Sequence, residues 1–124
     1  MYLSQSNIDL LRHHVEEEGG FQIAIAPMFP QLFPNVWMAA ESLYKELNTA
    51  GYSVLLDDRN QRPKNMFEVI EFLGIRHRVV ISSRSISANV MEYRDLETDE
   101  FYKVVLDSAS EFLFDRLLTA SPPT

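Results

Sequence analysis

The side chains in this sequence best suited to chemistry are five charged residues that fall within eight positions. They belong to the segment DDRNQRPK at residues 57–64: Asp57, Asp58, Arg59, Arg62 and Lys64. A carboxylate can accept hydrogen bonds from the Watson–Crick N–H groups of an unstacked guanine, and an arginine can donate to another edge of the base. Arginine and lysine can also contact phosphates. The segment therefore has the groups needed to read a guanine in a single-stranded RNA loop. The alternative is a solvated loop with local Asp–Arg pairs.

Aromatic residues are a second set of candidate RNA contacts. Phe29 and Phe33 lie in a proline-rich loop, whereas Trp37 and Phe67 fall within helical patterns. A base stacked on an aromatic ring contributes roughly 1–3 kcal/mol to binding. The same residues also fit packing roles, which we favour for Phe67. Phe29 and Phe33 are therefore candidate stacking residues.

Other kinds of site have little support in the sequence. The chain has no cysteine, so disulfides and thiol catalysis are excluded. His13 and His14 are adjacent and point to different sides of a helix, so together with His77 they do not form a metal set. Phosphate-loop, dinucleotide-binding and serine-hydrolase motifs are missing. The sequence predicts no catalytic residue, no metal and no cofactor.

The composition of the chain limits the ways in which it can bind RNA. The chain has 124 residues, which fits one domain, and 46% of them are hydrophobic, which argues against disorder. Its net charge of −7 counts against broad, non-specific binding to nucleic acid. A local basic patch within an acidic domain is still compatible with this charge, so RNA binding must be argued from particular residues. Without a long apolar run or a signal peptide, we expect a cytoplasmic protein that does not contact a membrane.

The spacing of apolar residues predicts an α/β domain. Helices are expected at residues 7–18, 35–50 with Asn35 as N-cap, 63–73, and from Asp107 onward; strands are expected at 21–27, 53–56, 78–81, 90–94 and 100–104. Strands separated by helices predict parallel pairing, and the closing hairpin makes the sheet mixed. We divide the chain into a linker helix (1–20), one domain (21–118) and a disordered tail (119–124).

The charged segment also occupies a favourable place in such a fold. In open α/β sheets, ligands bind beyond the carboxyl ends of the strands. Three predicted loops follow strands there: residues 27–34, 57–64 and the polar loop 82–89. A helix that starts near Pro63 would add free N–H groups, which favour a phosphate. The topology therefore indicates the same segment as the residue chemistry does.

Most of the chain resembles a known family. The matching segments are FQIAIAPM, AESLYKELNTAGYSVLLDDRNQRP, MFEVIEFLGIRHRVVIS and MEYRDLETDEFYKVVLDSASEFL, in this order. They resemble the anticodon-binding domain of class II aminoacyl-tRNA synthetases, and most closely the C-terminal domain of bacterial-type prolyl-tRNA synthetases.

The resemblance implies a mixed five-stranded sheet flanked by helices. It also implies binding of the anticodon stem-loop of proline tRNA, whose anticodons carry two adjacent guanines. The site would include Asp57, Asp58, Arg59, Arg62 and the start of the helix that carries Met66, with Phe67 and Glu68. The catalytic motifs of such synthetases belong to an upstream domain, so we expect no enzyme activity from this chain alone. The parent enzyme would be a proline–tRNA ligase.

Three departures from the family pattern leave a second hypothesis open. Lys64 replaces a glycine, Arg76 replaces a proline, and Ser82 or Ser83 stands where the family has the glycine that ends the third strand. The chain could therefore be a divergent, free-standing relative that binds another RNA or a protein partner. A synthetase catalytic domain, in the same chain or separate, is one expected partner. A homodimer formed through exposed apolar residues is another.

Overall fold

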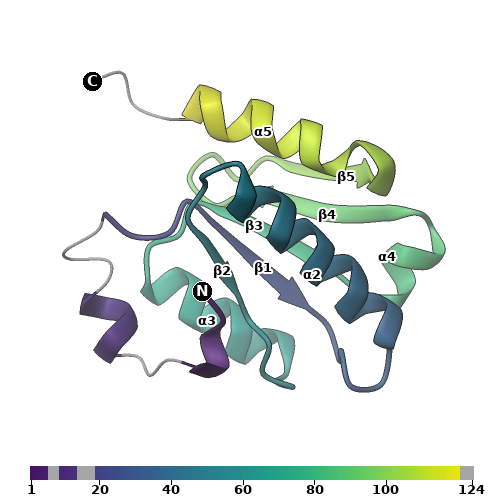
Figure 1. Cartoon of the computed structure of the whole chain (residues 1–124), viewed down its shortest axis with the longest axis horizontal. Coiled ribbons are helices and arrows are strands. Elements are labelled where there is room, and N and C mark those ends of the chain that lie inside the picture. The colour runs from purple at the N-terminus through teal and green to yellow at the C-terminus, as the bar shows by residue number, and fades with distance from the viewer. Residues whose placement is uncertain (6–8, 14–18, 121–124) are drawn as a thin grey trace.

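The computed structural model describes residues 1–5, 9–13 and 19–120. Its centre is a five-stranded sheet with strand order β2-β1-β3-β4-β5. Helices α2 and α3 lie on opposite faces of this sheet (Figure 1). The predicted α/β class, with a mixed five-stranded sheet between helices, is confirmed.

Three parallel strands form one half of the sheet. They are β1 (Ile23–Pro27), β2 (Val54–Leu56) and β3 (His77–Ile81), with β1 in the middle. All five residues of β1 are buried because both of its faces are covered. Ile23 and Ile25 pack on the α2 side, while Ala24 and Ala26 leave room for α3 on the other.

The antiparallel half contains β4 (Val90–Asp95) and β5 (Phe101–Val105), which form the predicted hairpin. Between β3 and β4 lies a short helix, α4 (Ser83–Ser87), where the sequence predicted a polar loop. That prediction was wrong because Ser82 and Ser85 form a capping box. The Ser85 N–H donates to Ser82 Oγ at 3.0 Å, and the Ser82 N–H donates to Ser85 Oγ at 2.9 Å.

Helices α2 (Pro34–Thr49) and α5 (Ala109–Ala120) cover one face of the sheet. Asn35 is not the N-cap of α2: the helix starts at Pro34, which needs no partner for an N–H that it lacks. Asp107 lies in a 3-10 turn, η2 (Leu106–Ser108), that precedes α5. The α5 helix extends two residues past the predicted domain boundary at 118, and residues 121–124 lie outside the described part.

On the other face, α3 (Pro63–Phe72) covers only the parallel half. Met66 and Ile70 of α3 pack against Ala24 and Leu55, and the core on this side contains no buried residue from β4 or β5. In the described ranges, no helix covers this face of the hairpin. The sheet therefore leaves one side of β4 and β5 open.

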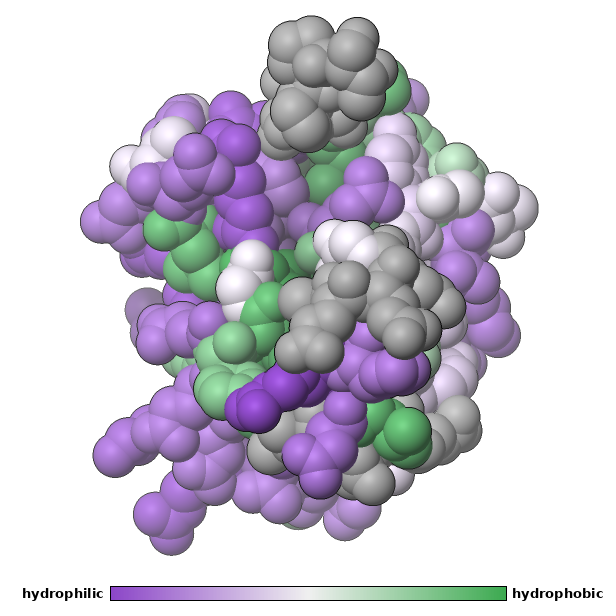
Figure 2. Space-filling model, turned by 90° about the vertical axis from the view of Figure 1, so that its left-hand side faces the viewer, coloured by the Kyte–Doolittle hydropathy of each residue, from purple (hydrophilic) through white to green (hydrophobic). Residues whose placement is uncertain are grey.

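The N-terminal residues extend the α3 side of the core. The 3-10 turn η1 (Leu3–Gln5) buries Leu3, and Tyr2 forms a parallel bridge to Leu56 at the edge of β2. Of the predicted linker helix 7–18, residues 9–13 are helical and the rest lies outside the described residues. Figure 2 shows that apolar side chains on this side of the molecule are scattered among hydrophilic ones. In the part of the chain described, no helix has the length and apolar character needed to cross a membrane.

Candidate nucleic-acid interface

The buried carboxylate of the charged loop is already paired within the loop. Asp57, which is 2% exposed, accepts hydrogen bonds from the Arg59 backbone N–H at 3.1 Å, from Nε at 3.0 Å and from Nη2 at 2.9 Å. These bonds raise the pKa of the Arg59 guanidinium. Asp57 therefore fixes the position of Arg59, whose side chain remains 29% exposed.

Asp58 is engaged by the N-terminal segment. Its two carboxylate oxygens accept hydrogen bonds from the Ser4 backbone N–H at 2.8 Å and from Ser4 Oγ at 2.5 Å. Because Tyr2 is bridged to Leu56, this segment lies beside the loop and not free in solution. A ligand that uses Asp58 as an acceptor must replace the two Ser4 donors.

The remaining charged residues of the predicted site face solvent at the start of α3. Arg62 is the exposed N-cap residue, and Pro63 occupies the first turn. The Lys64 and Glu68 side chains are 85% and 61% exposed, and their charged atoms are 4.0 Å apart. An ion pair this exposed adds little stability. Arg62, Lys64 and Glu68 are therefore available to a ligand.

Phe29 and Phe33 lie in the loop that follows β1. Phe29 has a φ of +50°, which is unfavourable for a residue with a side chain, and its carbonyl accepts N–H bonds from Leu32 and Phe33 at 3.0 and 3.1 Å. These two backbone hydrogen bonds therefore hold the conformation of the turn. The Phe29 and Phe33 side chains are 40% and 36% exposed, so both rings can contact a ligand.

A second group of candidates, almost entirely missed by the sequence analysis, lies on the uncovered side of the hairpin. Two rows of side chains cross strands β3, β4 and β5 in register, with Phe67 of α3 beside them. We call this group the open sheet face, and it consists of Arg78, Arg94, Phe101, Val80, Glu92, Lys103 and Phe67. Only Phe67 was predicted as a site residue.

Arg78 is the least satisfied member of the open sheet face. Its guanidinium carbon lies 3.9 Å from the centroid of the Phe67 ring, and its Nε is buried without a hydrogen-bond partner among the described residues. Arg94 is its direct cross-strand partner. Burial and the nearby charge of Arg94 lower the pKa of Arg78, while Glu71 opposes them. Like charges placed opposite each other on a sheet are unfavourable unless something lies between them.

The rest of the open sheet face is shaped for a ligand with both charge and flat apolar surface. Arg94 lies 5.0 Å from the centroid of Phe101, and its Nη1 is 2.7 Å from the exposed carboxylate of Asp99. A cavity of about 150 Å³ opens between Phe67, Arg78, Glu92, Arg94 and Phe101. With Lys103, three cations stand beside the two carboxylates of Glu92 and Asp99, so this surface is slightly basic in a chain whose net charge is −7.

Arg76, which departs from the family pattern, belongs to a structural network at the end of β4. Its Nε and Nη2 donate to the buried carboxylate of Asp95 at 3.0 and 2.9 Å, and Arg116 of α5 donates to the same carboxylate at 3.2 Å. Burial alone would raise the pKa of Asp95, but the bonds from Arg76 and from the Thr98 and Glu97 N–H groups hold it well below its usual range. Arg76 is therefore paired with a buried carboxylate of the fold.

The comparison with known families agrees with this geometry. A model of the anticodon binding domain family matches residues 22–116, from the start of the sheet into α5. The match includes both the charged loop and the whole open sheet face. The chain therefore belongs to the family of anticodon-binding domains found in class II aminoacyl-tRNA synthetases. Membership of this family implies that the domain binds tRNA through the anticodon.

Proposed function

We propose that this domain binds the anticodon loop of proline tRNA and distinguishes its two adjacent guanines from other bases. The observation that carries the proposal is Arg78, which is stacked on Phe67 and faces Arg94 on a sheet surface that no described helix covers. Two arginines without a shared counterion, beside exposed rings, are suited to an RNA loop.

The open sheet face supplies the chemistry that guanine recognition needs. An arginine can donate two hydrogen bonds to O6 and N7 of guanine, a pattern that adenine cannot accept. Phe67 and Phe101 offer stacking surfaces on either side of the arginine pair. Glu92, which lies between Val80 and Lys103, can accept from a base N–H. Reading of one of the two guanines is therefore assigned to this surface.

The charged loop and the start of α3 complete the interface. Arg59 is held by Asp57, so it can donate to RNA from a fixed position. Arg62 and Lys64 are exposed beside the first turn of α3, where backbone N–H groups also favour a phosphate. We assign them to the RNA backbone. Phe29 and Phe33 can stack on a base at the carboxyl end of β1.

The preference for proline tRNA rests on the resemblance of DDRNQRP and MFEVIEFLGIRHRVVIS to the prolyl branch. Asp58 adds support because it already accepts two adjacent donors from Ser4. A guanine presents two neighbouring N–H donors on its Watson–Crick edge. The same carboxylate can therefore accept a guanine if the base replaces Ser4.

The direct test is a titration of the chain with a proline-tRNA anticodon stem-loop at low and at physiological salt. A second stem-loop carries adenine in place of the two guanines. We expect each guanine lost to weaken binding by about 1–3 kcal/mol. Equal, weak binding of the two loops would contradict the proposal.

Matched arginine variants show where the discrimination arises. Arg94→Gln and Arg78→Gln should reduce the preference for guanine, and Arg59→Ala and Arg62→Ala should weaken binding. Arg84→Ala is the control, because Arg84 is an exposed arginine on α4 outside the open sheet face. If Arg84→Ala weakened binding as much as Arg94→Gln does, the chain would bind RNA only through non-specific charge attraction.

A second function is supported by the apolar surface near the start of α2. Leu32 and Met38 are 70% and 69% exposed, close in sequence to Phe29 and Phe33. This surface suits a protein partner, such as a synthetase catalytic domain or a second copy of the chain. The Leu32→Ser/Met38→Ser double variant separates the two functions. It should leave the RNA titration unchanged while it removes any self-association seen by analytical ultracentrifugation.

A further inference from the structure

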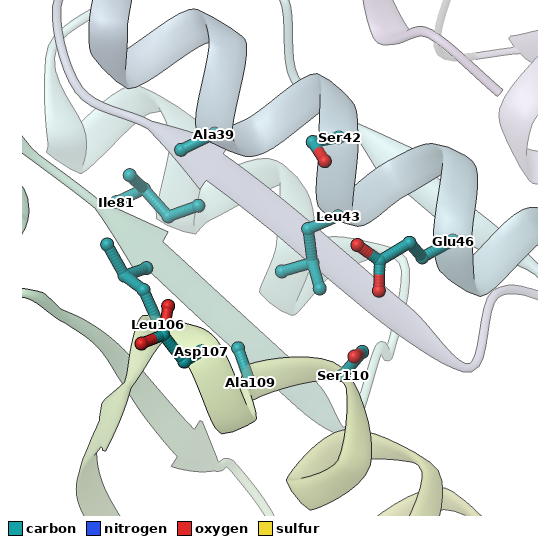
Figure 3. Close-up of a pocket in the computed structure, with 9 residues that line it drawn as sticks. All are labelled: Ala39, Ser42, Leu43, Glu46, Ile81, Leu106, Asp107, Ala109 and Ser110. Atoms are coloured by element: carbon teal, nitrogen blue, oxygen red, sulfur yellow. The ribbon is translucent and has the colours of Figure 1, made fainter.

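A cavity on the α2 and α5 side of the sheet plays no part in the proposed function. It has a volume of about 320 Å³ and lies where α2, the end of β3 and the η2–α5 segment meet (Figure 3). The sheet separates it from the open sheet face, because Ile81 and Leu43 at the cavity belong to the α2 side of the core. A ligand here would not touch RNA bound on the other side.

The cavity exists because the side chains between the two helices are short. Those along its walls are Ala39, Ser42, Ala109 and Ser110. None of them is long enough to fill the space over Leu43 and Ile81, which are 7% and 1% exposed and form an apolar floor. At about 320 Å³, the space is at the small end of the range for ligand pockets.

Two carboxylates at the cavity belong to solvent-exposed residues and have no counterion among the described residues. Glu46 comes from α2 and Asp107 from η2, and no hydrogen bond or ion pair joins either carboxylate to another residue that the structure describes. None of the described lining residues is a lysine, an arginine or a histidine. Earlier on α2, by contrast, the carboxylate of Glu41 lies 3.5 Å from Nζ of Lys45. The cavity is therefore an anionic site with an apolar floor.

The placement of the two charges suggests the shape of the ligand. In Figure 3, Glu46 and Asp107 lie toward opposite ends of the lining residues, with Leu43 and Ala109 between them. A ligand that satisfies this arrangement has two cationic ends and an apolar middle. A single small cation would satisfy only one end, and a neutral apolar molecule would satisfy neither.

A metal ion fits the arrangement less well. Magnesium and calcium require several oxygen ligands at one point, whereas the two carboxylates here are separated. Among the residues described, no group of three or more His, Cys, Asp or Glu could hold a metal. We propose that this cavity binds a linear aliphatic diamine or polyamine, whose ammonium groups pair with Glu46 and Asp107 and whose methylenes lie over Leu43.

The first test is an NMR titration of the ¹⁵N-labelled chain at constant ionic strength. The probes are 1,5-diaminopentane, pentylamine and 1-pentanol, which differ in the number of ammonium groups on the same five-carbon chain. The diamine should shift amide signals of α2 and η2, and pentylamine should bind up to about fivefold more weakly, as expected for one lost exposed ion pair. Pentanol should not bind. Equal affinity for all three probes would overturn the proposal.

Variants then locate the site. Glu46→Gln and Asp107→Asn should each weaken diamine binding by up to about fivefold, and Ser42→Leu should abolish it by filling the cavity. Glu111→Gln is the matched control, because it removes the same charge from α5 outside the cavity lining. An equal loss in Glu111→Gln would show that only general charge attracts the diamine, which would also overturn the proposal.

Two further measurements distinguish the diamine site from the RNA interface and from a groove for a protein segment. Glu46→Gln and Asp107→Asn should keep the guanine preference of the RNA titration, so failure of one proposal leaves the other intact. The capped tripeptide acetyl-Gly-Lys-Gly-amide presents a single lysine side chain. If it bound more tightly than the diamine, the occupant would be a protein segment and the polyamine assignment would be wrong.

Discussion

Two groups of arginines lie around strands β3 and β4, and they differ in how completely their guanidinium groups are paired. At the end of β4, Arg76 and Arg116 share the buried carboxylate of Asp95. On the open sheet face, Arg78 and Arg94 lie opposite each other, and the Arg78 Nε has no described partner. Among the residues described, Arg78 and Arg94 share no such counterion, and Arg94 pairs only with the exposed carboxylate of Asp99. We infer that the first two arginines stabilise the fold and that the second two serve a ligand.

Removing the shared carboxylate should have the largest effect. Asp95→Asn removes the buried counterion that two partly buried guanidinium groups share and leaves them only the more exposed carboxylates of Glu97 and Glu100. We therefore expect the free energy of unfolding to fall by about 3 kcal/mol. Urea denaturation measures this loss. The control is Asp99→Asn, which removes the exposed partner of Arg94 and should change stability by less than about 0.5 kcal/mol. Equal effects in the two variants would erase the distinction drawn between the groups.

The stability of the chain should also depend on pH, through His77 and Asp95. Burial lowers the pKa of His77, whose Nδ1 lies 2.6 Å from Tyr93 Oη. The unfolded chain then binds more protons below pH ~6.5, so stability should fall as the pH drops from about 7 toward 5. The His77→Gln variant should lose this dependence. Because the pKa of Asp95 is also held low, a second loss should begin below about pH 5, and Asp95→Asn should lack it.

Changes on the open sheet face should affect stability in the opposite direction. Arg78→Met keeps an apolar stem over Phe67 while it removes the repulsion with Arg94, so we expect stability to rise by up to about 1 kcal/mol. Thermal unfolding measures this gain, and the RNA titration should show a loss of affinity in the same protein. A destabilised Arg78→Met protein would mean that this arginine holds the fold together.

Lys64 should show the smallest effect. Its side chain is 85% exposed and only weakly paired, so Lys64→Ala should change stability by less than about 0.5 kcal/mol. A phosphate contact predicts uniformly weaker binding to both stem-loops and a salt dependence reduced by about one unit of slope. Tighter binding of RNA by Lys64→Ala would show instead that this lysine obstructs the loop where the family has glycine.

The sequence predicted the sheet well because the alternation of apolar residues in the strands agrees with the residues that start and end the helices. It did not predict α4, because a five-residue serine-rich helix has no apolar stripe to reveal it. The alternation in MEYRD places Glu92 and Arg94 on one face of their strand, but the sequence does not show that Arg78 joins them or that helices leave this face uncovered. That property depends on α3 covering only half of the sheet.

The sequence also did not predict which residues far apart in the chain form pairs. Arg76 reads as a departure from a family proline, but its partner Asp95 lies 19 residues away and becomes visible only in the fold. Asp58 reads as a base-reading carboxylate, whereas the structure places Ser4 on it from 54 residues away. The local Asp57–Arg59 pair, in contrast, was one of the two alternatives that the loop sequence allowed.

The two edges of the sheet differ in how easily a strand of another molecule could pair with them, which is a route to aggregation. The N-terminal segment closes the β2 edge through the bridge between Tyr2 and Leu56. No described segment pairs with the outer edge of β5, which could accept a strand from another molecule. Lys103 stands in the middle of that edge, and a lysine there discourages such pairing. A substitution made at Lys103 to weaken RNA binding would therefore also remove a safeguard against self-assembly.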